Sequence, residues 1–164
     1  MTPLPQAKRF DWSNLALRAA SALVLAPAAL AAVWWGGWPF LVLVSVGVAL
    51  MAIEWGGMTA PYAPIRVTTA VAAAVLAPVF LLYLDYEPAA WAVMIAGALM
   101  AAFIARHVAE RPADAAFGVL YIAAPVLALV WLRDAPDGRL WVFLLFGVAW
   151  SADIAAFLVG SVLK

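Results

Sequence analysis

Residues 150–164 read Trp-Ser-Ala-Asp-Ile-Ala-Ala-Phe-Leu-Val-Gly-Ser-Val-Leu-Lys and place a carboxylate inside an apolar run. The run covers residues 140–163, where Asp153 is the only ionisable side chain, and it is long enough to cross a bilayer. A carboxylate inside a membrane is costly and usually faces a partner, a metal ion or water. Helical spacing puts these residues on the face of Asp153: Phe146, Trp150, Phe157, Gly160 and Lys164. This face holds most of the chemistry that the chain offers.

The composition assigns the chain to the membrane proteins. Hydrophobic residues make up 69% of it and charged residues 11%, whereas about a quarter of the residues in a soluble domain are charged. Nine basic and nine acidic residues cancel, so no bulk positive field attracts nucleic acid. The lack of cysteine excludes disulfides, a thiolate nucleophile and a cysteine-ligated metal, and the single His107 cannot form a multi-histidine site.

The apolar runs predict an all-α fold, a polytopic membrane helix bundle with about six transmembrane helices. A polar tail at residues 1–14 is expected to be cytoplasmic and to precede the transmembrane domain at residues 15–164. The predicted spans are residues 15–35, 40–53, 67–84, 89–105, 118–132 and 140–163. The second and fifth are shorter than the roughly 20 residues that a perpendicular crossing needs.

The distribution of basic residues predicts that the N-terminus and the C-terminus are both cytoplasmic. This topology puts seven basic residues on the inner side: Lys8, Arg9, Arg18, Arg66, Arg106, Arg111 and Lys164. Only Arg133 and Arg139 then lie outside, as the positive-inside rule favours. The same topology places these aromatic residues at the outer interface: Trp34, Trp35, Trp38, Tyr83, Tyr86, Trp91, Trp131 and Trp141. Aromatic rings are enriched at membrane interfaces, so this second signal agrees with the first.

A faint internal repeat is also visible. Ala-Pro pairs end at Pro27, Pro78 and Pro125, in the first, third and fifth predicted spans. The repeat suggests three helical hairpins with proline kinks at similar depth. A chain rich in alanine and proline also produces such pairs by chance, so both interpretations stay open.

The segment around Asp153 resembles a motif of the phosphatidate cytidylyltransferases, which are integral membrane enzymes also called CDP-diacylglycerol synthases. Their motif is roughly W-x-x-D-x-x-A-[YF]-x-x-G, and it is matched in place by Trp150, Asp153, Ala156, Phe157 and Gly160. In the family a basic residue follows the glycine and a Gly-Lys pair comes shortly after it. Here Ser161 replaces the basic residue, and Lys164 lacks its preceding glycine.

Three shorter motifs of the family occur in the same order along the chain. An early R-x-x-[ST]-A is similar to Arg18-Ala-Ala-Ser-Ala, and an E-W pair is similar to Glu54-Trp55. A succession of G-x-x-Y, proline, leucine-arginine and glycine is similar to Gly118, Tyr121, Pro125, Leu132-Arg133 and Gly138. Together with the Asp153 segment, these motifs extend the resemblance over nearly all of residues 15–164.

The resemblance implies a nucleotidyltransferase of phospholipid biosynthesis that is a multi-pass protein of the cell inner membrane. It also makes a homodimer a candidate assembly. Its reaction joins CTP and phosphatidic acid to give CDP-diacylglycerol and pyrophosphate, with Mg²⁺ as the cofactor. Asp153 is the implied catalytic residue and metal ligand, and Lys164 and Arg18 are the implied substrate-binding residues. In the family, the segment that holds the metals and both substrates follows the motif around Asp153. We therefore expect residues 1–164 to be a truncated or partial form of the enzyme that is inactive alone.

The depth of Asp153 fits this interpretation. It lies 13 residues after Leu140, about 20 Å along a helix that crosses a core roughly 30 Å thick, and therefore nearer the cytoplasmic face. A structural alternative is that Asp153 bonds to a neighbouring helix, and that Lys164 and Arg18 only anchor helix ends.

Two other classes of function stay open. The chain could be a small transport or channel subunit that uses Asp153 as an ion or proton site. It could also be a catalytically silent membrane scaffold.

Overall fold

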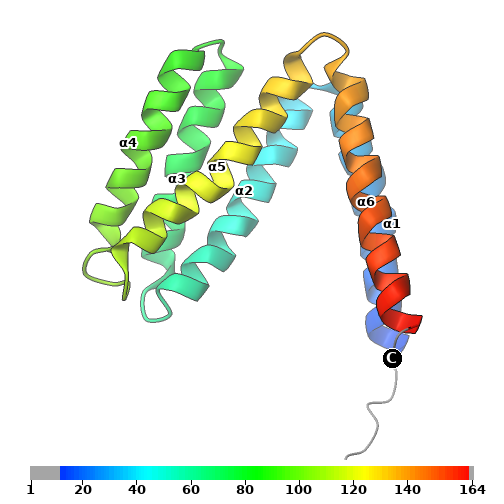
Figure 1. Ribbon diagram of the computed structural model, residues 1–164, viewed down its shortest axis with the longest axis horizontal. Coiled ribbons are helices and arrows are strands. Elements are labelled where there is room, and N and C mark those ends of the chain that lie inside the picture. The colour runs from blue at the N-terminus through cyan, green and yellow to red at the C-terminus, as the bar shows by residue number, and fades with distance from the viewer. Residues whose placement is uncertain (1–11, 163–164) are drawn as a thin grey trace, which may run out of the picture.

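The computed structural model describes residues 12–162, with the side chains of residues 23–160, and this part of the chain is helical without strands. Six helices follow one another in antiparallel order (Figure 1). They are α1 Trp12–Trp35, α2 Gly37–Thr59, α3 Pro64–Tyr83, α4 Glu87–Ala105, α5 Pro112–Asp134 and α6 Gly138–Val162. Helices α2 to α5 and residues 138–160 of α6 are long and apolar enough to cross a membrane. The predicted all-α polytopic bundle is confirmed.

Two helices are longer than their predicted spans. The sequence predicts residues 40–53 and 118–132, whereas α2 has 23 residues and α5 has 23. Helix α2 begins before Pro39, which lies in its first turn, where proline removes no intrahelical hydrogen bond. Helix α5 likewise begins at Pro112, in the charged stretch that lies between the predicted spans 89–105 and 118–132. Both helices are therefore long enough for a full crossing.

Helices α2 to α5 form a four-helix core in which α3 contacts each of the other three. Four valines spaced four residues apart along α3 are fully buried: Val67, Val71, Val75 and Val79. Small residues let the neighbours approach closely. An added Cβ on Gly97 of α4 would come within 2.9 Å of the Ala74 Cβ, and one on Gly56 of α2 would overlap Thr68.

Helices α1 and α6 lie beside each other and diverge from the four-helix core (Figure 1). The turns after α1, α3 and α5 lie at one end of the bundle, which we call the outer end after the predicted topology. The turns after α2 and α4 lie at the opposite, inner end. The α1–α6 pair meets the core at the outer end and separates from it toward the inner end.

Burial follows this arrangement. Within the apolar window of α6, 6% of the residues are buried, compared with 28–44% in α2 to α5. The buried residues of the α1–α6 pair gather at the outer end: Ala32, Val33 and Gly36 from α1 and its turn, and Gly138 and Val142 from α6. Farther toward the inner end, the described side chains of both helices are half-buried or exposed and mostly apolar, as expected of helices in contact with lipid.

The three Ala-Pro pairs lie inside α1, α3 and α5. Their surroundings differ, because Pro78 is buried in the core while Pro27 and Pro125 are exposed. The three prolines therefore do not occupy equivalent positions in the bundle.

Candidate functional site

Asp153 faces α1 across an apolar groove of about 450 Å³. Trp150, Asp153 and Ile154 line the groove from α6, and Leu25, Ala26 and Ala29 line it from α1. Asp153 is exposed rather than packed, and it is the only charged side chain among these six residues. The groove therefore combines one carboxylate with an apolar surface, which is suited to a ligand that has a polar head and a hydrocarbon part.

The predicted face of α6 is present in part. The rings of Phe146 and Trp150 lie 5.8 Å apart, and Trp150 continues the same side of the helix to Asp153. Farther along, Phe157 is 66% exposed, and a Cβ added to Gly160 would have no neighbour within 4 Å. Within the described residues, the apolar groove thus ends near Asp153 and the face continues as an open surface.

The two other residues that the sequence singled out cannot be assigned contacts. Residue 18 belongs to α1, seven positions before Leu25 and hence about two turns nearer the inner end, but the Arg18 side chain lies outside the described ones. Lys164 lies outside the described residues altogether. The structure therefore places one of the three predicted site residues, Asp153, in a defined environment.

Asp153 belongs to no cluster of potential metal ligands in the described part of the chain. No three acidic or histidine side chains come together there as a candidate metal centre. Magnesium prefers six oxygen ligands and is commonly held by one or two carboxylates together with substrate phosphates. The Asp153 carboxylate fits a shared site of that kind, and it does not form a resident metal centre alone.

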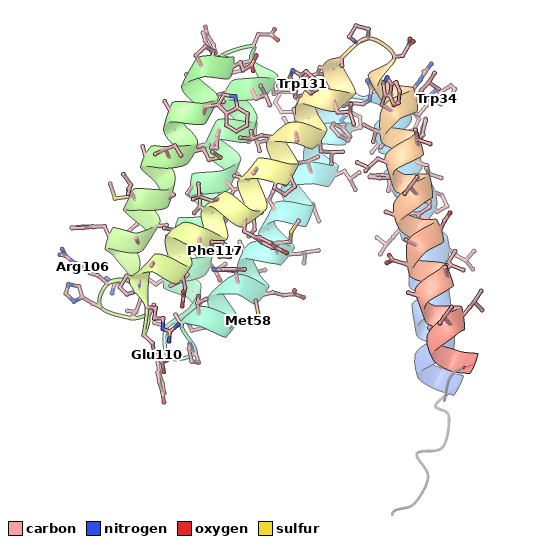
Figure 2. The ribbon with its side chains drawn as sticks, viewed as in Figure 1. Trp34, Met58, Arg106, Glu110, Phe117 and Trp131 are labelled. Atoms are coloured by element: carbon pink, nitrogen blue, oxygen red, sulfur yellow. The ribbon has the colours of Figure 1, made fainter. Side chains whose placement is uncertain are left out.

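Two other short motifs meet at the inner end of the core. The Trp55 ring lies 5.8 Å from the Tyr121 ring and 5.9 Å from the Phe117 ring, and a Cβ added to Gly118 would overlap the Trp55 indole. The Trp55 Nε1–H donates a hydrogen bond of 2.9 Å to the Asp114 backbone carbonyl. The E-W and G-x-x-Y motifs thus form one contact between α2 and α5, with Phe117 labelled in Figure 2.

This contact gives the two motifs a structural role. Glycine is required at position 118 because the indole occupies the space of a side chain. The sequence does not predict this contact, because spacing along the chain does not reveal which helices pack together. The shared position of the two motifs at the inner ends of two spans was the available signal.

Comparison with known proteins agrees with the sequence motifs. A model of the cytidylyltransferase family matches residues 16–164. Comparisons with curated proteins and with solved structures return no match. The matched region contains all six helices except the first residues of α1, and it includes Asp153, the aromatic contact of Trp55 with Gly118, and the groove between α1 and α6. This membrane helix bundle belongs to the cytidylyltransferase family.

Proposed function

We propose that the protein is a phosphatidate cytidylyltransferase, which transfers the cytidylyl group of CTP to phosphatidic acid within the membrane. The main support for this proposal is the match of residues 16–164 to the cytidylyltransferase family model, in a chain with five described helices long enough to cross a membrane. A nucleotide-using enzyme made largely of such helices is suited to an acceptor that is itself a lipid. We further propose the cell inner membrane as its location.

The reaction is a nucleotidyl transfer. A phosphate oxygen of phosphatidic acid attacks the α-phosphorus of CTP, a new phosphorus–oxygen bond forms, and the bond to the β-phosphate bridge breaks. Pyrophosphate leaves with that bridging oxygen, and CDP-diacylglycerol stays in the membrane. Because both reactants are polyanions, the site has to hold them in line and offset their charge.

The α1–α6 groove is the proposed position of the reaction. Asp153 lies 15 residues after the start of α6 at Gly138, about 22 Å along the helix and therefore toward the inner end. That depth suits the phosphate of a membrane lipid meeting a nucleotide from the cytoplasm. The apolar lining contributed by Leu25, Ala29 and Ile154 suits the adjoining glycerol and acyl groups of the lipid.

We propose that Asp153 works together with magnesium that is shared with the phosphates of CTP. Bound there, the ion would offset phosphate charge, and Asp153 would supply one of its oxygen ligands. Arg18 and Lys164 are the proposed phosphate-binding side chains, because guanidinium and ammonium groups form strong charge-assisted hydrogen bonds to phosphate. Residues 1–164 alone are expected to be inactive, since one carboxylate does not position two polyanions.

Acceptor specificity tests this proposal. Membranes that contain the protein as its gene encodes it are supplied with magnesium and CTP labelled in the α-phosphate, with phosphatidic acid, an isoprenoid phosphate or diacylglycerol as acceptor. We expect labelled, organic-soluble product with phosphatidic acid and none with diacylglycerol, which lacks the attacking phosphate. Equal or greater labelling with the isoprenoid phosphate would contradict phosphatidic acid as the substrate while leaving cytidylyl transfer intact.

A further inference from the structure

Two arginines at the outer end bind the last turn of α1. The Arg133 Nε–H donates a hydrogen bond of 2.9 Å to the Val33 carbonyl oxygen, and the Arg133 Nη2–H donates one of 3.4 Å to the Trp34 carbonyl oxygen. The guanidinium carbon of Arg139 lies 4.2 Å from the centroid of the Trp34 ring. Trp34, labelled in Figure 2, is thus contacted both from the end of α5 and from the start of α6. We call these contacts the arginine clamp.

The end of α1 needs such partners. The last carbonyl groups of a helix have no donors within the helix, and an unsatisfied carbonyl is costly in a membrane. Gly36 ends the helix with φ 66°, and its N–H donates to the Ala32 carbonyl oxygen at 2.9 Å. The Val33 and Trp34 carbonyls, which come next, accept the Arg133 bonds instead. A cation is also favourable there because the helix dipole is negative at its C-terminus.

The fit around Arg133 is close. A Cβ added to Gly36 would overlap Arg133 Nη2, and the φ of 66° already favours glycine at that position. Arg133 is half-buried, in contrast to a basic side chain that extends into water. This explains why an arginine is kept at the end that the positive-inside rule disfavours.

Away from the outer end, the α1–α6 pair has little attachment to the core among the described residues. The α6 residues after Val142 are half-buried or exposed through Gly160, and those of α1 before Ala32 are likewise not buried where their side chains are described. Asp153 lies 11 residues beyond Val142, so it sits about 16 Å along the helix from the attached end. Small rotations at the clamp therefore become large displacements at Asp153.

We propose that Arg133 is a positioning residue that fixes the direction of the α1–α6 pair, and with it the location of Asp153 relative to the four-helix core. It acts from the opposite end of the bundle and touches neither Asp153 nor its groove. Arg139 supports it through the Trp34 ring. That Asp153 acts in catalysis rests on the proposed function, whereas the placement of Asp153 by Arg133 does not.

Spin-label distances test the clamp without any substrate. The chain has no cysteine, so a cysteine pair at positions 157 and 58 reports the α6-to-α2 distance at the inner end, and a pair at positions 103 and 58 reports distances within the core. Phe157, Met58 and Phe103 are 66%, 69% and 56% exposed, so labels there should disturb little. Both pairs are measured in lipid nanodiscs by double electron–electron resonance.

In Arg133→Ala we expect the 157–58 distribution to widen about twofold, because the helix between Val142 and position 157, about 22 Å long, amplifies motion at its attached end. The 103–58 distribution should stay unchanged, and Arg133→Lys should widen the first distribution less, since lysine keeps the charge but loses the planar fork. Arg66→Ala, in α3, is the matched control and should alter neither distance. An unchanged 157–58 distribution, or equal broadening of both pairs, would overturn the proposal. If Arg133→Ala does not fold, Arg133→Lys decides the question: an unchanged 157–58 distribution, or equal broadening of both pairs, in that variant would also overturn the proposal.

Discussion

The indole of Trp55 lies on the backbone of Gly118, which is 63 residues later in the sequence, and this contact joins two motifs at the inner end of the core. A hydrogen bond to the Asp114 carbonyl and the adjacent Tyr121 ring hold the indole in its place. Trp55 therefore has little freedom to move away from a larger residue at position 118. The contact should accordingly contribute to stability rather than to substrate binding.

Gly118→Ala tests this interpretation of the Trp55 contact. The added methyl group would overlap the indole, and overpacking of this kind costs about 1 to 3 kcal/mol. We expect a lower unfolding midpoint in detergent for Gly118→Ala, and little further lowering when the same change is added to Trp55→Ala, because the indole that the methyl group would meet is then absent. Gly147→Ala is the matched control, because a Cβ there meets nothing within 4 Å and alanine favours a helix. Equal midpoints for the Gly118 and Gly147 variants would refute the packing role.

Asp153 shows how far the sequence could predict the candidate site. Helical periodicity placed Trp150 on the side of Asp153, and both residues line the same groove. The facing residues of α1, Leu25 and Ala29 among them, were not predictable, because an apolar residue in a membrane helix gives no signal of which helix it faces. The Arg133 clamp was missed for a related reason, since its partners are backbone carbonyls, which no residue type marks.

At the scale of the helices, the sequence predicted which helices are present and in what order better than it predicted the residues at which they begin and end. The segments around Gly56-Gly57 and Pro112 carry residues typical of turns, yet they belong to α2 and α5. Gly56 lies inside a helix because α3 packs against it, with Thr68 in the space of a side chain. Pro112 lies in a first turn, where the missing N–H has no cost. A tertiary contact therefore accounts for Gly56, and position within the helix accounts for Pro112.

The pairing of helices was the least predictable feature. All six are apolar over most of their circumference, so no polar face distinguishes the four core helices from the α1–α6 pair. The contrast between 6% burial in α6 and 44% in α5 arises from packing alone. Close approach at Gly97 and Gly56 marks the core, whereas the glycines of α6 at positions 147 and 160 have open surroundings.

At the scale of the whole molecule, the alternation of turns puts the start of α1 and the end of α6 at the same end of the bundle (Figure 1). The seven basic residues assigned to the inner side, against two outside, predict that this end is cytoplasmic. Arg133 and Arg139, the two exceptions to this prediction, both contact α1, which would give their predicted position outside a structural reason.

Reporter fusions test the topology. Fusions after residues 60 and 110, in the turns after α2 and α4, should report the cytoplasm, and fusions after residues 37, 87 and 136 should report the opposite side. Mutating Arg133 and Arg139 should leave the pattern unchanged, because the basic excess inside remains. An outside signal at residue 110 would contradict the orientation and with it the cytoplasmic approach of CTP to Asp153.

The most direct test of the account is turnover in variants of Asp153, the carboxylate at which we place cytidylyl transfer. CDP-diacylglycerol formation is measured per folded molecule at saturating magnesium, for the unaltered protein as its gene encodes it and for Asp153→Asn and Asp153→Ala. Asparagine keeps the size and the hydrogen-bonding capacity of the side chain but removes its charge. We expect both variants to insert and accumulate normally and to lose about 100-fold or more in turnover, about 2.7 kcal/mol in the barrier. Near-normal turnover in Asp153→Asn would contradict the account, because the negative charge of Asp153 would then not be needed for cytidylyl transfer.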